Sequence, residues 1–294
     1  MSANGEARLT SMRAAIEAEL SWMVTAEYPE ALYDAMAYSL LAPGKRLRPL
    51  LTLAACEACG GAEDDAMPFA CALEMIHAYS LIHDDLPAMD DDDLRRGRPT
   101  SHIQFGEALA ILAGDALLNL AYEVMCAHCV EYEGAQYVQA MQAVALAAGA
   151  KGMVGGQVVD VLNENKRVDE DTLMYIHRNK TGALIRAALI AGSTAAGADA
   201  ATCLRFGQLG EKLGLAFQIQ DDILDEVSTT EALGKPVHSD AKNQKNTAVS
   251  MYGLEEAQAR YAALCAAVQE MAAELSAEGS LLRVLVESMA KRLS

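Results

Sequence analysis

The sequence has few proline and few aromatic residues. Proline contributes 7 of 294 residues and aromatic residues 5%, whereas hydrophobic residues of all kinds reach 52%. Because strands favour aromatic side chains and proline interrupts helices, this composition indicates a helical protein. No strand-like alternation persists, and no Gly/Ser-rich linker divides the chain. We therefore predict an all-α, single-domain bundle over residues 1–294, with roughly ten to thirteen helices around a central cavity and residues 1–8 frayed.

Positive charge is also scarce. Lys and Arg number 23 against 41 Asp and Glu, which gives a net charge of −18. Nucleic-acid binding requires a basic face, so nucleic acid is excluded as a partner. The sequence shows neither a basic segment followed by an apolar core nor a run of about 18 apolar residues. It therefore predicts no signal peptide, no membrane span and a cytoplasmic location.

The seven cysteines are an odd number in a long chain, which does not fit a disulfide framework. Two CxxC pairs, Cys56 with Cys59 and Cys126 with Cys129, together could form a four-thiolate zinc site. Both pairs lie in apolar helical segments, and their separation far exceeds the spacing of a zinc ribbon. We interpret them as small buried hydrophobic residues.

Residues 74–100 form the most informative segment. An apolar, helix-patterned run ends in Asp84 and Asp85; a proline and four aspartates beginning with Asp90 follow, and then two arginines. Mg²⁺ in proteins is typically held by one or two carboxylates together with substrate phosphates. Arginine suits phosphate oxygens because its planar fork donates two parallel hydrogen bonds. The segment predicts a metal-assisted polyanion site, although a single cluster of this kind is equally well a solvated acidic loop.

A second acidic cluster argues against the solvated loop. Asp221, Asp222 and Asp225 form a DDxxD motif within another helix-patterned segment. Residues four apart share one face of a helix, so these carboxylates repel one another unless cations neutralise them. Two such clusters on separate helices that face each other would clamp several metal ions.

Isolated basic residues complete the pattern. Lys45, Arg46 and Arg48 crowd a loop–helix junction, which taken alone fits an ordinary surface patch equally well. Lys180 lies in an otherwise apolar helix, where a lysine is costly unless it is paired or reaches solvent. His77 follows Glu74 in an ExxH pattern like half of a di-iron site, but no second copy exists, so iron is rejected.

Taken together, these motifs resemble the short-chain trans-isoprenyl diphosphate synthases, most closely the bacterial farnesyl diphosphate synthases. The motifs are GKRLRP (44–49), HDDLPAMDDDDLRRGRPT (83–100), GGQ (155–157), KTG (180–182), FQIQDDILD (217–225) and GK (234–235). They follow the family's order over residues 30–250. The resemblance implies a prenyltransferase of isoprenoid synthase fold, active as a homodimer. It would condense isopentenyl diphosphate head-to-tail with dimethylallyl or geranyl diphosphate, giving mainly farnesyl diphosphate.

The resemblance also implies a role for each motif residue. About three Mg²⁺ ions, or Mn²⁺ in their place, are expected as cofactors. The expected metal ligands are Asp84, Asp90 and Asp221, assisted by Asp85 and Asp225. The expected catalytic residues are Lys180, Thr181, Gln218 and Lys235. The expected diphosphate-binding residues are Lys45, Arg48, His77, Arg95 and Arg96. Lys291 or Arg292 is a candidate for closing the site.

Product length is expected to depend on Tyr79 and Ser80. Tyr79 precedes Asp84 by five residues, about 7.5 Å along a helix, whereas Ser80 shares the face of Asp84 more closely. Periodicity leaves open which side chain faces the product tail; the resemblance implies Tyr79 and a farnesyl product. A geranylgeranyl diphosphate synthase is the alternative. A class I terpene cyclase is disfavoured by GKRLRP and the doubled aspartates, and a non-catalytic subunit would have lost those aspartates.

Overall fold

The structure, a computed structural model, describes residues 3–227 and 246–290. The first half of the chain forms α1 (Ala3–Met23), α2 (Glu30–Leu40), α3 (Leu47–Ala58), α4 (Glu63–Asp84), β1 (Leu94–Arg95), β2 (Arg98–Pro99), α5 (Ser101–Phe105) and α6 (Glu107–Glu131). The second half forms α7 (Ala135–Ala148), α8 (Met153–Leu162), α9 (Glu170–Ile176), the π-helical turn η1 (His177–Thr181), α10 (Gly182–Ala195), α11 (Ala200–Val227), α14 (Ala248–Tyr252), α15 (Leu254–Leu275) and α16 (Leu281–Ala290).

The predicted all-α class is confirmed. Helices α1 to α4, α6 to α8, α10, α11, α15 and α16 each span ten residues or more, in agreement with the expected number. Within the described ranges, β-structure is limited to the two-residue strands β1 and β2, which pair antiparallel in a hairpin. The single-domain organisation stays a prediction. It is supported by α11, which contributes side chains to both hydrophobic clusters of the described chain.

The N-terminal helix corrects one expectation. We predicted fraying of residues 1–8, yet α1 begins at Ala3. The buried side chains of Leu9, Ile16 and Leu20 dock this helix onto the core, and it packs against α3, α4 and α16. Tertiary contacts of this kind stabilise a helix beyond the reach of its local propensity.

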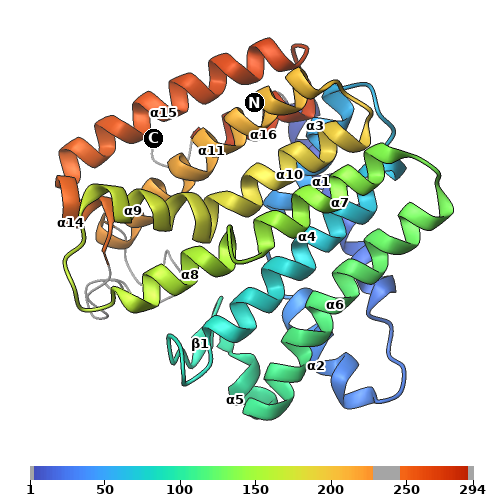
Figure 1. Cartoon of the computed structure of the whole chain (residues 1–294), viewed down its shortest axis with the longest axis vertical. Coiled ribbons are helices and arrows are strands. Elements are labelled where there is room, and N and C mark those ends of the chain that lie inside the picture. Colours follow the sequence, from blue (N-terminus) through green and yellow to red (C-terminus); the bar gives the residue numbers. More distant parts are fainter. Residues whose placement is uncertain (1–2, 228–245, 291–294) are drawn as a thin grey trace.

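Helix α10 lies at the centre of the bundle. It packs against α3, α4, α7 and α11, and all of its residues except Arg186 and Ile190 are buried (Figure 1). Small residues dominate its sequence, which allows the neighbouring helices to approach closely. A helix that is apolar on every side belongs in a protein core. The turn η1 precedes α10 directly, so the residues of η1 are held at the edge of this rigid core.

Helix α4 delivers the first aspartate motif. Its first turn is acidic, which suits the positive end of the helix dipole, and the Asp65 carboxylate accepts a hydrogen bond from the Ala62 N–H. Its last residue is Asp84, consistent with the expected break before Pro87. Beyond the break the chain folds back, and the Asp90 N–H donates to the Asp84 carbonyl at 2.9 Å. This turn places Asp90 beside Asp84 although the two are six residues apart.

Helix α6 is the one described helix that is long and apolar enough to cross a membrane, judged by length and composition only. The long helices of soluble proteins pass the same test, so it is weak evidence for a membrane span. Its inner side packs on α4, whereas Ile111, Leu112 and Val130 are exposed.

The cysteine pairs show no zinc geometry within residues 3–227 and 246–290. Cys56 is buried, and burial raises the pKa of its thiol to about 12. Burial likewise raises the pKa of Cys59 to about 11. Zinc binds the thiolate, so these shifts oppose metal binding and favour the interpretation of the pair as packing residues.

Candidate active site

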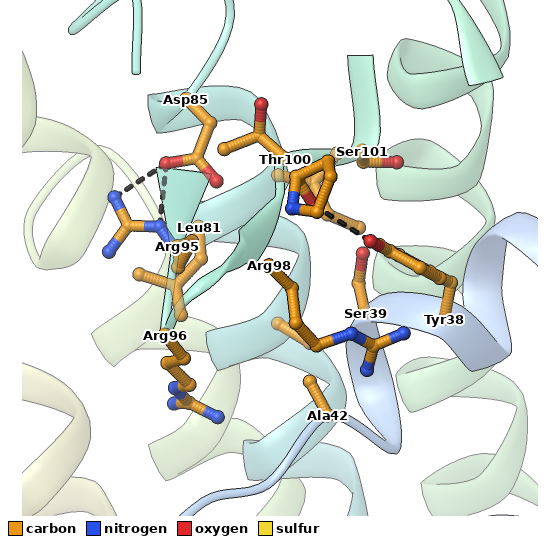
Figure 2. A pocket seen from close by; sticks show the side chains of 13 residues that line it. Tyr38, Ser39, Ala42, Leu81, Asp85, Arg95, Arg96, Arg98, Thr100 and Ser101 are labelled. Atoms are coloured by element: carbon orange, nitrogen blue, oxygen red, sulfur yellow. Dashed lines mark hydrogen bonds and ion pairs between the residues drawn. The ribbon is translucent and has the colours of Figure 1, made fainter. Parts of the chain in front are cut away.

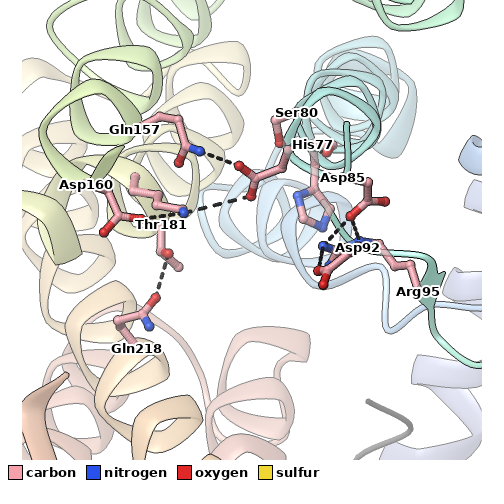
Figure 3. A network of polar contacts seen from close by, with 11 residues as sticks. His77, Ser80, Asp85, Asp92, Arg95, Gln157, Asp160, Thr181 and Gln218 are labelled. Carbon is pink, nitrogen blue, oxygen red and sulfur yellow. Dashed lines mark hydrogen bonds and ion pairs between the residues drawn. The ribbon is translucent and has the colours of Figure 1, made fainter. Parts of the chain in front are cut away.

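A polar network joins α4, α8 and η1 across the middle of the molecule (Figure 3). Gln157 on α8 donates a hydrogen bond from Nε2 to Oδ1 of Asp84. Lys180 on η1 donates from Nζ to Oδ2 of Asp160 at 2.7 Å and lies 3.8 Å from Oδ2 of Asp84. The first aspartate motif, the GGQ segment and the KTG segment therefore meet at one point.

A close helix approach makes this meeting possible. The Cβ that any larger residue would add at Gly156 would lie 2.8 Å from the Lys180 Cα. Such a distance is too short for two carbon atoms, so α8 can reach η1 only with glycine at this position. The GGQ motif thus serves two purposes: its glycine brings the helices together, and its glutamine reaches Asp84.

The charge of Lys180 is stabilised by surrounding carboxylates. Burial alone would lower the pKa of this ammonium group, but Asp84, Asp160 and Asp90 together hold it above the ordinary value. Lys180 is therefore charged at any physiological pH. A fixed positive charge beside Asp84 and Asp90 is the arrangement required by a diphosphate that also contacts metal ions.

The second aspartate motif meets η1 through hydrogen bonds. The Thr181 hydroxyl donates to Oε1 of Gln218 at 2.6 Å, and Nε2 of Gln218 donates to Oδ1 of Asp222 at 2.9 Å. The other oxygen of Asp222 accepts from the Ala248 N–H at 2.6 Å. Asp222 is buried, so these partners offset the desolvation of its carboxylate. These contacts fix Thr181 and Gln218, which Figure 3 shows across the network from His77 and Asp85.

The two arginines at the basic turn before α3 have different surroundings. Arg46 has φ 50°, points into the core and forms an ion pair with Glu74 at 2.8 Å. Arg48, two residues further on, lines the central cavity, and its Nε is buried without a hydrogen-bond partner in the described chain. Burial lowers the pKa of Arg48, whereas Glu74 and, more weakly, Asp221 raise it. A cationic side chain in the wall of the cavity is suited to an anion.

His77 faces the same cavity in its neutral form. Burial lowers the pKa of His77 well below the ordinary value, and Arg48 is the first of several arginines that lower it further. A neutral imidazole beside these cations can still donate one hydrogen bond to a phosphate oxygen. Lys45 is exposed at the start of the same turn.

The hairpin after the first motif carries the arginine pair (Figure 2). Arg95 donates from Nε to Oδ1 of Asp85 at 2.6 Å, and its Nη2 forms an ion pair with the same oxygen at 2.5 Å. Burial raises the pKa of Asp85 to about 6, and the hydrogen bond from Arg95 opposes this rise. Arg96 occupies the hairpin turn with φ 54° and donates to the Pro43 carbonyl at 2.8 Å. Arg96 thus lies beside the turn that carries Lys45 and Arg48.

A cavity with an empty volume of about 920 Å³ connects the polar and apolar parts of the site. Lys180, Thr181 and Asp84 lie in its polar wall. Tyr79, Ser80 and His83 of α4, with Met89, Met153, Val154 and Val158, form its less polar part. Tyr79 is buried, and burial raises the pKa of its hydroxyl to about 12. The cavity therefore offers space for a charged head and an apolar tail.

The donor set fits a hard divalent cation. Asp84, Asp90, Asp221 and Asp225 supply carboxylate oxygens, the ligands that Mg²⁺ prefers. No group of three His, Cys, Asp or Glu side chains within residues 3–227 and 246–290 is arranged to hold a metal ion alone. In proteins, substrate phosphates and water normally complete the coordination shell of Mg²⁺.

Most of the predicted residues converge on this region. Arg48, His77, Tyr79, Ser80, Asp84, Lys180 and Thr181 line the central cavity, and Gln218 lines an adjoining one. Asp225 is buried in α11, and Asp85 is turned to Arg95. Lys235, Lys291 and Arg292 lie outside the described residues. The site prediction did not include Asp160, His177 or Asp222, although Asp222 is the middle aspartate of DDxxD and His177 lies one turn before Lys180.

Comparison with known proteins points to the same family as the sequence motifs. A profile of the polyprenyl synthetase family matches residues 29–281. A farnesyl diphosphate synthase from Geobacillus stearothermophilus is 44% identical, over 97% of this chain and 96% of its own. A geranylgeranyl diphosphate synthase from Cyanophora paradoxa is 48% identical, over 82% of this chain and 81% of its own. A geranyltransferase from Helicobacter pylori, solved with magnesium and an isoprenyl diphosphate, superimposes with a TM-score of 0.86 at 32% identity, covering 100% of this chain and 98% of that one.

The helical fold, shared with solved isoprenoid synthases, and the two aspartate motifs of the sequence define an isoprenoid synthase. The chain belongs to the polyprenyl synthetase family. It is a metal-dependent trans-prenyltransferase, as the sequence motifs predict.

Proposed function

We propose that this prenyltransferase condenses isopentenyl diphosphate head-to-tail with dimethylallyl or geranyl diphosphate, and that farnesyl diphosphate is its main product. One observation carries the proposal. Lys180 contacts Asp84 of the first motif, while the adjacent Thr181 is bonded to Gln218, which precedes the second motif by three residues. The two motifs therefore act on one ligand space and form a single site.

The allylic diphosphate is the leaving group. Asp84, Asp90 and Asp221 would hold about three Mg²⁺ ions, or Mn²⁺ in their place, which would supply positive charge to the diphosphate leaving group. Lys180 adds a fixed positive charge beside these carboxylates, and Arg95 and Lys235 are proposed to do the same. Asp85 orients Arg95, and Asp225 assists Asp221. Preorganised charge of this kind lowers the barrier because it needs no rearrangement during the reaction.

The second substrate is proposed to bind at the basic turn. Lys45, Arg48, His77 and Arg96 are proposed to hold one diphosphate; in support, Arg48 and His77 line one cavity, and Arg96 bonds to Pro43 in the turn before α3. The guanidinium of Arg48 and the neutral imidazole of His77, both in the wall of the central cavity, supply the donors. The double bond of isopentenyl diphosphate would then lie against the allylic carbon.

The remaining steps need no protein base. Thr181 and Gln218 present oxygen dipoles that steady the allylic cation, while the departing diphosphate accepts the final proton. Water must be kept from the cation, and the buried wall around Thr181 contributes to this exclusion. Tyr79 is proposed to form the floor of the tail cavity, which limits the product to farnesyl length, with Ser80 beside it.

The exposed apolar face of α6 supports assembly of two chains. Ile111, Leu112 and Val130 on α6 and Val138 and Leu146 on α7 are exposed. We propose a homodimer that covers this face, working in the cytoplasm. A partner chain that covers the exposed apolar side chains of α6 would account for them without a membrane.

The deciding experiment is a product profile. Purified enzyme is incubated with isopentenyl diphosphate, each allylic primer in turn and Mg²⁺, and the chain lengths of the products are measured. A main C15 product from both primers is expected. A main C20 product would favour the geranylgeranyl alternative, and cyclised hydrocarbons would refute prenyl transfer.

The floor is tested by one substitution. Tyr79→Ala should shift products to C20 or longer, because the ring that fills the end of the cavity is removed, and the first condensation should continue. A folded, active variant that still makes only C15 would place the floor elsewhere.

A further inference from the structure

A second ring supports Tyr79 in the wall of the tail cavity. His83 lies one helical turn after Tyr79 on α4, and the two rings meet edge-to-face, with 5.7 Å between centroids and 80° between planes. Both side chains line the central cavity. In the described chain the Tyr79 hydroxyl makes no hydrogen bond, so packing alone sets the direction of its ring.

His83 itself is held by α6. Its Nε2 lies 3.1 Å from the Ile111 carbonyl oxygen, which can only accept, so Nε2 carries the proton and donates. The oxygen Oδ1 of Asp115 lies further away, at 3.8 Å from the same nitrogen, and its side chain is largely exposed. The imidazole is therefore tied to the backbone of the neighbouring helix rather than to a mobile side chain.

Gly114 provides the space that the imidazole occupies. A Cβ at this position would lie 2.6 Å from Cδ2 of His83 and 3.1 Å from Cε1. A side chain at this position would displace the His83 ring from the niche and disturb its edge-to-face contact with Tyr79. A glycine inside a 25-residue helix is costly by about 1 kcal/mol relative to alanine, and this niche gives a reason for it.

We propose that His83 and Gly114 are specificity-determining positioning residues, which fix the Tyr79 ring across the tail cavity and thereby set the product length. The proposal rests on the proposed function, since it presumes that Tyr79 limits the product to C15. His83 contacts the tail cavity next to Tyr79, but its effect is exerted through the orientation of that ring. An edge-to-face aromatic pair fixes a ring with an energy that corresponds to about a two- to tenfold bias between orientations.

The test compares product length in His83→Ala, Gly114→Ala and Tyr79→Ala with the native enzyme. The ratio of C20 to C15 products should rise about two- to tenfold in His83→Ala and in the same direction in Gly114→Ala, which displaces the imidazole. The rate of the first condensation and the melting temperature are recorded for each variant. A merely structural role would lower both of these without moving the product ratio.

Two double variants test whether His83 acts through the Tyr79 ring and Gly114 through His83. In a Tyr79→Ala background, His83→Ala should add no further lengthening, because its effect requires the ring that has been removed. Gly114→Ala added to His83→Ala should likewise change nothing further, because the niche is already empty. Independent, multiplicative effects in either pair would overturn the proposal.

Asp115→Asn is the matched control. It removes the carboxylate near His83 Nε2 but leaves the bond to the Ile111 carbonyl, so product length should stay as in the native enzyme. A shift as large as that of His83→Ala would show that an ion pair, not ring packing, controls the tail. If Tyr79→Ala lengthens the products and His83→Ala does not, the positioning role of His83 is refuted while Tyr79 remains the floor of the cavity. If neither variant lengthens the products, the proposed role of Tyr79 as the floor is itself refuted.

Discussion

The buried ion pair between Arg46 and Glu74 allows the sharpest prediction about the binding turn. The side chains are 2% and 5% exposed, and Nη1 of Arg46 lies 2.8 Å from Oε1 of Glu74. Arg46 also donates from Nη2 to the Ala42 carbonyl at 3.0 Å, while its Nε is buried without a hydrogen-bond partner in the described chain. Glu17 is 3.6 Å from that nitrogen but is half exposed. Glu74 is therefore the principal counter-charge of Arg46.

The substitution Glu74→Leu leaves the guanidinium buried without this carboxylate. Removing one partner of a buried pair costs about 3–5 kcal/mol. For a chain of 294 residues, this corresponds to a melting temperature lower by about 5–8 °C, from a typical unfolding entropy of about 2.1 cal/mol/K per residue. Urea unfolding and calorimetry at neutral pH measure the two quantities.

The double variant Arg46→Met with Glu74→Leu separates pairing from packing. Because a buried pair replaced by apolar residues of similar size is often neutral, the double variant should recover most of the stability lost in Glu74→Leu. Glu274→Gln, at the exposed pair with Arg205, is the matched control and should cost less than about 1 kcal/mol. Equal losses in Glu74→Leu and Glu274→Gln would refute the reasoning.

A kinetic consequence follows from the position of Arg46. Its left-handed backbone lies between Lys45 and Arg48, and its ion pair ties this turn to α4. The double variant Arg46→Met with Glu74→Leu should therefore keep its fold but bind isopentenyl diphosphate more weakly, with KM raised and kcat less affected. An unchanged KM in that variant would show that the turn is held by other contacts.

Three further predictions concern the metal, the arginines and acid stability. Asp221→Ala should lower turnover by about 10³-fold at saturating Mg²⁺ while leaving the melting temperature unchanged or higher, because it removes charge and relieves repulsion; near-normal turnover would exclude a two-cluster clamp. Arg96→Ala should mainly raise KM for isopentenyl diphosphate and Arg95→Ala mainly that for the allylic substrate, and equal effects of both on both substrates would contradict the division. Burial lowers the pKa of His177 from 6.5 to about 4, so the folded protein holds it neutral while the unfolded chain gains a proton as pH falls below 6.5. Stability from this group is present above pH 6.5 and declines by about 3 kcal/mol toward pH 4; His177→Gln should flatten this part of the urea-stability profile, and an identical slope would refute the assignment.

The sequence by itself determined the helical class, the break after Asp84 and the chemistry of the two acidic motifs. These features depend on local rules: helical periodicity, the effect of proline, and the preference of carboxylates for hard cations. It did not determine where α1 begins, because docking of Leu9 and Ile16 onto the core, not local propensity, extends that helix to Ala3. Lys235 lies outside the described residues, so its role stays a prediction.

Only the tertiary structure decided how side chains of similar chemistry divide their tasks. GKRLRP contains two arginines; the resemblance selects Arg48 for the diphosphate, and the structure supplies the physical reason, because Arg46 turns inward to Glu74 whereas Arg48 lines the cavity. Asp84 and Asp85 are adjacent, yet the first meets Gln157 and Lys180 and the second meets Arg95. His83 gained its place only because Gly114 of α6 lies opposite. Periodicity assigns a residue to a face of its own helix, but which helix lies opposite, and at what distance, depends on packing between segments far apart in the sequence.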